Sequence, residues 1–239
     1  STVENFQAIK QGMSKQVRDY DKMGTSFKFN TVMFCEQPFG ALSYPGYKIN
    51  GEPVSLMKSA LRVVLVDIGD GTTDVVGYYR GSPLPNERAG RNFGVSEIHE
   101  AVLRHLKSKY TVDGNISTHD IDQHFRNGKP MICLQGRKEV SVDLKSLPVF
   151  KSAVQDLVSK VFTLIRDNWT SFGKIDHIVF AGGFMELVSL EDILKKQGLP
   201  ESKCLVPDQP SQAIAQGIRV FLNLLIDKKA KDKKNEAEV

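Results

Sequence analysis

The feature that most constrains the fold of this sequence is a Gly-rich segment between two short apolar runs, within residues 61–79. Val63 to Val66 form an apolar, β-branched run, which predicts a buried strand. Val75 to Tyr79 predict a second strand that returns antiparallel to the first. The segment between them, Asp67-Ile-Gly-Asp-Gly-Thr-Thr-Asp74, is therefore expected to be the turn of a β-hairpin.

This turn carries the residue types that bind an anionic ligand. Gly69 and Gly71 have no Cβ, so backbone N–H groups beside them can approach phosphate oxygens. Thr72 and Thr73 add hydroxyl donors, and Asp67 supplies a hard carboxylate oxygen suited to hydrated Mg²⁺. The alternative interpretation is an ordinary turn in which the Asp and Thr side chains cap their own backbone.

The order Asp-x-Gly-x-Gly-Thr-Thr-Asp, from Asp67 to Asp74, closely resembles the second phosphate-binding motif of the actin-like ATPases. That superfamily includes actin, bacterial filament proteins, the seventy-kilodalton heat-shock chaperones and the sugar kinases. The resemblance implies an α/β, actin-like (ribonuclease H-like) ATPase fold with a mixed sheet flanked by helices. It also implies ATP or ADP as ligand, cradled by residues of this motif including Asp74, with Mg²⁺ held through water by Asp67.

Composition agrees with a globular, cytoplasmic protein and argues against several other classes. The 239 residues are 41% hydrophobic and 25% charged, no apolar run approaches the roughly 18 residues that span a bilayer, and residues 1–30 lack a signal-peptide pattern. The three scattered cysteines indicate buried thiols in a reducing compartment. Five lysines of Lys228–Lys234 account for the net charge of +4, so the remaining body is nearly neutral and direct nucleic-acid binding is not expected.

A second candidate site residue, Glu36, lies between an expected strand over residues 27–35 and a short helix that ends near Leu42. An N-terminal helix is expected before it, from Thr2 to about Val17. In the chaperone and filament branches of the superfamily, a glutamate at the matching position helps to position the attacking water or the hydrated metal. The alternative role for Glu36 is an acidic residue that favours the positive end of a helix dipole.

The segment from Ile175 to Phe184 predicts a buried strand that ends in a double glycine, followed by a helix through Leu194. Gly182 and Gly183 would let the backbone lie flat against a planar ring and would direct helix N–H groups at a ligand. This strand–Gly-Gly–helix turn resembles the adenosine motif of the same superfamily, which implies that Gly182, Gly183 and Phe184 flank adenosine.

Amphipathic spacing predicts two further long helices, over residues 95–109 and 149–171, the second closed by Trp169. Residues 81–85 are expected to form a turn before the first of these helices. Between the two helices we expect a small mixed insertion with a helix at 118–127 and paired strands at 131–134 and 139–144. Its helix often contacts the ribose and base in the family, which suggests Gln123 and Arg126 as candidates, whereas His119 and His124 lack a third metal ligand.

The final helix begins after Asp208-Gln-Pro210 and carries Ala213 and Gly217, a pattern similar to the connecting segment of ParM-like plasmid-segregation actins. In those proteins the small residues let two helices cross closely at an interdomain hinge. The family's first phosphate motif is absent from the sequence, so the resemblance implies an incomplete first domain and a complete second domain. The implied divisions are the later half of domain I at 1–60, domain II at 61–110 and 149–208, an inserted subdomain at 111–148, a returning helix at 209–227 and a charged tail at 228–239.

The resemblance implies the nucleotide-binding part of a Mg-ATP-dependent, filament-forming ATPase that serves plasmid segregation or a bacterial or archaeal cytoskeleton. Its expected partners are further copies of itself or a complementary N-terminal chain, together with a DNA-adaptor protein. The catalytic candidates are Glu36 and Asp67, and this chain alone is expected to hydrolyse ATP poorly. The alternatives are a catalytically inactive interaction module and half of a sugar kinase, for which no sugar-binding constellation is visible.

Overall fold

The computed structural model describes residues 17–20, 25–28, 40–43, 61–112, 116–169, 174–194, 197, 199–220 and 222–223. The chain divides into two compact units, Ser1–Glu36 and Gln37–Val239. In the first unit, strand β1 (Val17–Tyr20) pairs antiparallel with β2 (Thr25–Lys28). The expected helix over residues 2–17 and the strand over 27–35 otherwise lie outside the described residues, as do Glu36, the first part of the short helix and the charged tail.

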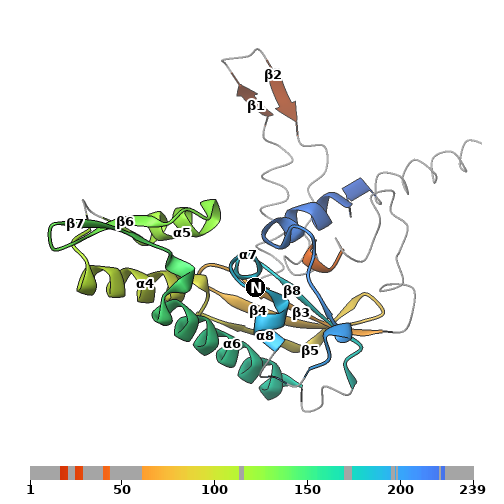
Figure 1. Cartoon of the computed structure of the whole chain (residues 1–239). Helices are drawn as coiled ribbons and strands as arrows, with labels where there is room; N and C mark the ends of the chain where they lie inside the picture. The colour runs from red at the N-terminus through yellow and green to blue at the C-terminus, as the bar shows by residue number, and fades with distance from the viewer. Residues whose placement is uncertain are drawn as a thin grey trace, which may run out of the picture. The chain divides into compact units, whose positions relative to one another are not determined.

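The second unit is built on a mixed sheet, as the family resemblance implies, and this sheet has five strands. Its members are β3 (Arg62–Ile68), β4 (Thr73–Tyr79), β5 (Ser82–Arg91), β8 (His177–Ala181) and β9 (Cys204–Leu205), in the order β5-β4-β3-β8-β9 (Figure 1). The hairpin β3–β4 and the pair β4–β5 are antiparallel, whereas β8 runs parallel to both β3 and β9. The central strand β3 therefore joins the phosphate-type hairpin to the strand that ends in the double glycine.

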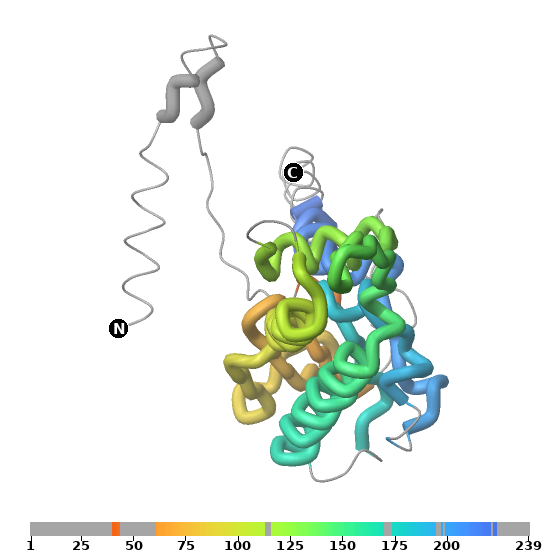
Figure 2. Tube along the Cα trace, turned by 60° about the vertical axis from the view of Figure 1, so that its left-hand side comes forward, coloured from red at the N-terminus to blue at the C-terminus, as the bar shows by residue number. Residues whose placement is uncertain are grey.

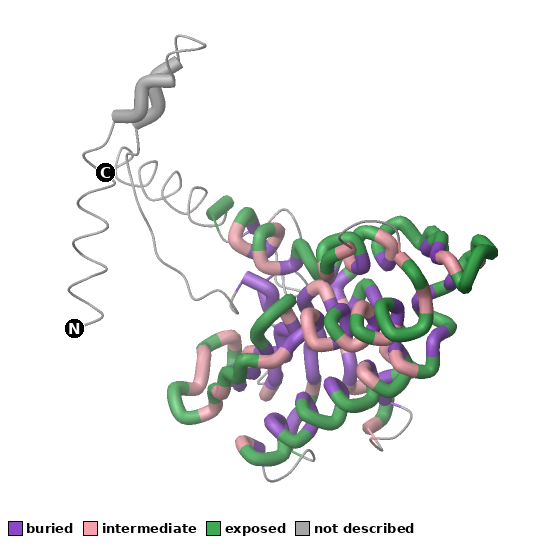
Figure 3. Tube along the Cα trace, turned by 90° about the vertical axis from the view of Figure 1, so that its left-hand side faces the viewer, coloured by how far each residue is buried: buried purple, intermediate pink, exposed green. Residues whose placement is uncertain are grey.

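Helices cover both faces of this sheet because β3 is apolar on both sides. Val64, Val66 and Ile68 belong to the larger core cluster, to which helices α4 (Val95–Lys109) and α6 (Pro148–Asn168) contribute their apolar faces. These two helices lie side by side (Figure 2). Val63 and Leu65 point to the opposite face, where they cluster with Ala41, Leu42 and Ala213 from the helical segments 40–43 and 213–220. Buried residues run along the strands, while the outer sides of the helices are exposed (Figure 3).

The two helical segments on this second face approach each other closely. A Cβ on Gly40 would lie 2.5 Å from the carbonyl oxygen of Ile214, which no side chain could tolerate without a shift. The last helix therefore approaches residues 40–43 closely, and Gly40 is one residue that permits this approach. The interdomain hinge expected at the last helix stays a prediction.

The helix and the paired strands expected between α4 and α6 are present beside the sheet. It contains α5 (Thr118–Asn127), the antiparallel pair β6 (Met131–Gln135) and β7 (Lys138–Val142), and the single turn η1 (Leu144–Ser146). Helix α5 begins with a capping box, in which the backbone N–H of Asp120 donates to Ser117 Oγ and the Asp120 carboxylate accepts from the backbone N–H of Ser117. Ile121 and Phe125 anchor its buried side in the core.

Two sequence-based expectations about secondary structure are wrong. Residues 81–85 do not form a simple turn, because β5 already begins at Ser82 and runs to Arg91 as the edge strand beside β4. The helix expected from 184 to 194 is broken into α7 (Phe184–Leu187) and α8 (Leu190–Leu194), because Val188 is extended. Two single turns, η3 (Glu201–Lys203) and η4 (Pro210–Gln212), flank β9 and the last helical segment.

Candidate functional site

The turn of the β3–β4 hairpin has the shape expected from its glycines. The backbone N–H of Gly69 donates to the carbonyl of Thr72 at 2.9 Å, which closes the turn and leaves Asp70, Gly71 and Thr72 exposed at its tip. Behind the tip, Asp67 and Asp74 pair directly across the two strands. The turn thus presents two glycines, one hydroxyl and two neighbouring carboxylates on one edge of the sheet.

Thr73 differs from the expectation that it cradles a phosphate. Its side chain is fully buried, and its Oγ1 donates to the carbonyl of Phe93 at 2.9 Å. The hydroxyl thereby ties the hairpin to the segment that leads into α4. Thr72 is the threonine of this turn whose side chain remains exposed to a ligand.

The buried carboxyl group of Asp67 has a strongly shifted pKa. Removal from water, together with the smaller effect of the nearby negative charge of Asp74, raises the pKa of Asp67 to about 6. Burial also raises the pKa of Asp74 above its ordinary value. A pair of neighbouring carboxylates with raised pKa values would be stabilised in the ionised form by a divalent cation.

The double glycine packs directly against this hairpin. Gly182 has φ +92°, and a Cβ there would lie 2.2 Å from the carbonyl oxygen of Ile68 and 2.7 Å from Asp67 Oδ1. Its backbone N–H donates to the carbonyl of Pro210 at 2.9 Å. A residue other than glycine at position 182 would therefore push the turn after β8 away from Asp67.

Helix α4 starts in contact with the same hairpin. The backbone N–H groups of Val95 and Ser96 donate to the carbonyls of Gly69 and Asp70, at 3.1 and 2.9 Å. A Cβ on Gly94 would lie 2.4 Å from the Asp70 carbonyl oxygen. The first turn of α4 is therefore used to hold the hairpin.

A small cavity of about 50 Å³ opens where the hairpin, the double glycine and helix α5 meet. Residues from four segments line it: the hairpin tip, helices α4 and α5, and the start of α7. The lining residues are Asp70, Val95, His99, Asp122, Arg126, Gly183, Glu186 and Leu187.

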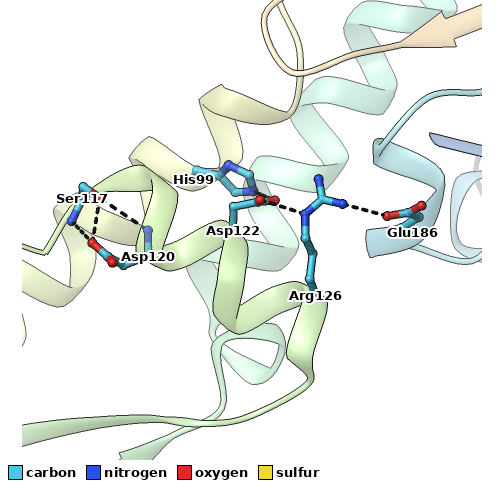
Figure 4. Close-up of polar contacts among 6 residues, drawn as sticks. All are labelled: His99, Ser117, Asp120, Asp122, Arg126 and Glu186. Atoms are coloured by element: carbon cyan, nitrogen blue, oxygen red, sulfur yellow. Dashed lines mark hydrogen bonds and ion pairs between the residues drawn. The ribbon is translucent and has the colours of Figure 1, made fainter. Parts of the chain in front are cut away.

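A chain of charged side chains crosses this cavity (Figure 4). Arg126 Nε donates to Asp122 Oδ2 at 2.8 Å, and Arg126 Nη1 donates to Glu186 Oε2 at 3.2 Å. The hydrogen bond to Asp122 raises the pKa of the Arg126 guanidinium further. The chain connects α5 of the inserted subdomain with α7, which follows the double glycine.

His99 lies at the inner end of this chain. Its side chain is buried and its ring stacks on Phe125. Its Nε2 lies 3.9 Å from Asp122 Oδ1 and has no hydrogen-bond partner among the residues that the structure describes. Burial lowers the pKa of His99, against the opposing effect of Asp122. The neutral ring therefore offers the cavity an unsatisfied polar nitrogen.

The structure brings some of the sequence-based candidates together and separates others. Gly183 and Arg126 line the cavity, whereas Gln123 is exposed on α5 and is not among the lining residues. Phe184 is completely buried in the core, so it supports the double-glycine turn from below. Glu36 lies outside the described residues.

The sequence analysis missed His99, Asp122 and Glu186. A signal for Asp122 was present, because an acid four residues before Arg126 is a common pairing on a helix face. His99 and Glu186 come from other elements, and spacing along the sequence does not reveal their position.

Residues 65–194 match the model of a protein family described as "Archaeal actin homologue MreB-like, C-terminal". This match covers more than half of the chain. The chain belongs to this MreB-like family.

Solved structures of actin-like proteins share the fold of this MreB-like chain. The apo structure of pSK41 ParM has a TM-score of 0.66 at 15% identity, covering 94% of this chain and 60% of that one. An archaeal actin homologue, Ta0583, in complex with ADP has a TM-score of 0.65 at 19% identity, covering 90% and 65%. A 15-stranded ParM filament from Clostridium botulinum has a TM-score of 0.64 at 19% identity, covering 93% and 63%.

These structures establish the actin-like fold, which confirms the expected fold class. The chain spans about 60–65% of the length of the three solved structures just described. No curated protein sequence matches it.

The donor chemistry of the site fits a hydrated cation better than a closed metal cage. Within the part of the chain that the structure describes, no group of three or more His, Cys, Asp or Glu side chains could hold a metal ion. Asp67 and Asp74 form a pair of hard oxygen donors, and Mg²⁺ is commonly held by one or two carboxylates with water and phosphate oxygens completing its shell. Among the same described residues, no helix is long and apolar enough to cross a membrane.

Proposed function

We propose that this MreB-like chain is the nucleotide-binding part of an actin-like ATPase that binds Mg-ATP and self-associates into filaments. The observation that carries the proposal is the convergence of the hairpin turn, the double glycine and Arg126 around one cavity. The structural match to an archaeal actin homologue solved with ADP supports a nucleotide as the ligand.

The proposal gives each exposed part of the site a role. The tip of the hairpin, with Gly71 and Thr72, would receive the phosphates, and Asp67 and Asp74 would hold hydrated Mg²⁺ through water. Gly183 would lie against adenosine, with Arg126 beside it. When bound, Mg²⁺ supplies charge neutralisation for the phosphate oxygens.

Asp67 is suited to this role only when it is ionised. A cation near its carboxylate would lower the pKa from about 6, so the ionised pair would be complete at neutral pH with metal present. Glu36 remains our candidate for orienting the attacking water.

The comparison with a ParM filament supports self-association, and plasmid segregation or a cytoskeletal role is the corresponding cellular function that we propose. A DNA contact would then run through an adaptor protein, given the nearly neutral body of the chain. Hydrolysis by the complete molecule would also need a complementary segment with the first phosphate motif.

Calorimetric titration of the full chain with Mg-ADP, and with ADP plus a chelator, tests the nucleotide site. In the wild type we expect Mg²⁺ to raise the affinity for ADP at least tenfold. In Asp67→Asn this gain in affinity should disappear, because the variant removes the buried carboxylate charge. Asp167→Asn, an exposed residue of α6, is the matched control. Equal Mg²⁺ dependence in the Asp67→Asn and wild-type chains would reject the metal assignment.

Filament formation needs its own test. ATP-dependent pelleting is measured for the chain alone and for the chain mixed with a polypeptide that carries the first phosphate motif. We expect pelleting only in the mixture, which holds both phosphate motifs. Nucleotide binding without pelleting in either mixture would reject the filament part of the proposal.

A further inference from the structure

Glu186 occupies the junction between the inserted subdomain and the double-glycine turn. It lies in α7, the helix that begins directly after Gly183, and its carboxylate accepts from Arg126 Nη1 at 3.2 Å (Figure 4). Its other oxygen accepts a hydrogen bond from the Ser211 hydroxyl in η4. One carboxylate therefore links α5 to the segment that enters the last helix.

Arg126 is held by two carboxylates that belong to different parts of the unit. Asp122 is one turn earlier on the same helix, so the Arg126–Asp122 pair moves with α5. Glu186 belongs to α7, so any separation of α5 from α7 breaks the Arg126–Glu186 pair and keeps the other. We call this second ion pair the clasp.

The closed clasp leaves too little room for a nucleoside. The cavity between α5 and the double glycine has a volume of about 50 Å³, whereas sites for small ligands typically enclose roughly 300–1,000 Å³. For an adenosine to lie against Gly183, Arg126 and Glu186 must part, either by movement of α5 or by rotation of the Arg126 side chain.

We propose that Glu186 sets the nucleotide affinity of this site by competing with the ligand for Arg126. The inference rests on the nucleotide-binding function proposed above. In this scheme the clasped form binds poorly and the open form binds well, so the apparent affinity is lowered by the fraction of molecules in which the clasp is closed.

The size of the effect follows from the exposure of the clasp. The side chains of Arg126 and Glu186 are 49% and 34% exposed, so water screens their attraction. An ion pair of this kind supports a change in affinity of about two- to fivefold.

The test compares the wild-type chain with Glu186→Gln, which keeps an oxygen acceptor for Ser211 and removes the charge that holds Arg126. The matched control is Glu100→Gln, which opens the exposed Arg104–Glu100 pair of α4, away from the cavity. We expect Glu186→Gln to bind Mg-ADP about two- to fivefold more tightly, and Glu100→Gln to bind as the wild type does. The gain should vanish in an Arg126→Met background, because the competition requires both partners.

A second measurement tests the clasp without nucleotide. Hydrogen exchange of the amides in α5 should be faster in Glu186→Gln than in the wild type, and unchanged in Glu100→Gln. Unchanged or weaker Mg-ADP binding by Glu186→Gln, with binding retained in the wild type, would overturn the clasp and leave the nucleotide site standing. Absence of Mg-ADP binding in both chains would overturn the proposed function together with the inference that rests on it.

Discussion

Asp67 and Asp74 lie directly opposite each other in the β3–β4 pairing, and the charge of Asp74 adds to burial in raising the pKa of Asp67 to about 6. Like charges placed opposite each other in a sheet are destabilising, so the hairpin is under electrostatic strain at neutral pH. The repulsion between Asp67 and Asp74 therefore lowers the stability of the folded chain, and a bound cation would reduce this repulsion.

The raised pKa predicts how stability depends on pH. Between the ordinary Asp value and about 6, the folded chain holds a proton on Asp67 that the unfolded chain has lost. The stabilisation is fully present below the ordinary pKa and disappears as pH rises through 6, a total loss on the order of 3 kcal/mol. Urea unfolding at pH 4.5, 5.5 and 7.5 measures it.

Asp67→Asn supplies the comparison for this pH dependence. The variant should lose less stability between pH 4.5 and 7.5 than the wild type, with the remainder coming from Asp74, whose pKa is also raised. Parallel pH profiles for the two chains would show that Asp67 titrates normally.

Alanine substitutions at the two glycines of the adenosine-type turn should differ in their effect on the free energy of unfolding. In Gly182→Ala the new Cβ would meet the Ile68 carbonyl at 2.2 Å from a backbone with φ +92°, which should cost at least about 2 kcal/mol of unfolding free energy. In Gly183→Ala the Cβ meets no described residue within 4 Å, so stability should stay within about 0.5 kcal/mol of the wild type.

Nucleotide binding then tests whether Gly183 contacts the ligand, independently of any effect on stability. Gly183 lines the cavity, so its alanine variant should bind Mg-ADP more weakly while keeping the thermal midpoint of the wild type. Wild-type affinity in Gly183→Ala would place adenosine elsewhere.

The elements that the sequence predicts well are those with a local pattern. The β3–β4 hairpin, α4 and α6 carry apolar runs or helical spacing that correspond to their burial. Trp169 ends α6 as expected, as its C-cap residue.

Strand β5 was missed because Pro83, Pro85 and Gly90 interrupt its pattern. Proline is tolerated at the edge of a sheet, and β5 is an edge strand, so its partner β4 decides its conformation. The break in the helix after Leu187 had a local signal, since Ser189 and Asp192 bond each other as a cap at the start of α8.

The candidate site was only partly predictable for a different reason. The glycine turns have motifs, but Glu186 meets Arg126 from 60 residues away, across two elements. No periodicity in the sequence encodes that contact, which depends on how α5 packs beside α7.

The two threonines of the hairpin give a further test, because the structure assigns them different surroundings. Thr73→Val should lower stability by about 1 kcal/mol, since it removes the hydrogen bond to the Phe93 carbonyl and leaves that acceptor unpaired. Thr72→Val, at the exposed tip, should leave the unfolding free energy nearly unchanged and weaken Mg-ADP binding. Chemical denaturation and calorimetry of both variants distinguish these outcomes, and a stable Thr73→Val chain would contradict the structural role of that hydroxyl.

The last prediction concerns Glu87, which lies in a polar cluster that joins β3, β5 and the end of α6. Its carboxylate accepts from Trp169 Nε1 at 2.7 Å and from the guanidinium of Arg62, and it packs against Gly77. Glu87→Ala would leave the buried indole N–H and a half-buried cation without their acceptor, at a cost of about 1–3 kcal/mol.

Fluorescence can follow this change directly, because Trp169 is the single tryptophan of the chain and only 5% of it is exposed. Water that replaces the Glu87 carboxylate should shift the tryptophan emission to longer wavelength in the folded variant. Glu100→Ala, which breaks an exposed ion pair, should change neither the emission nor the unfolding free energy beyond about 0.5 kcal/mol. Wild-type emission and stability in Glu87→Ala would mean that burial of Trp169 is maintained by the core alone.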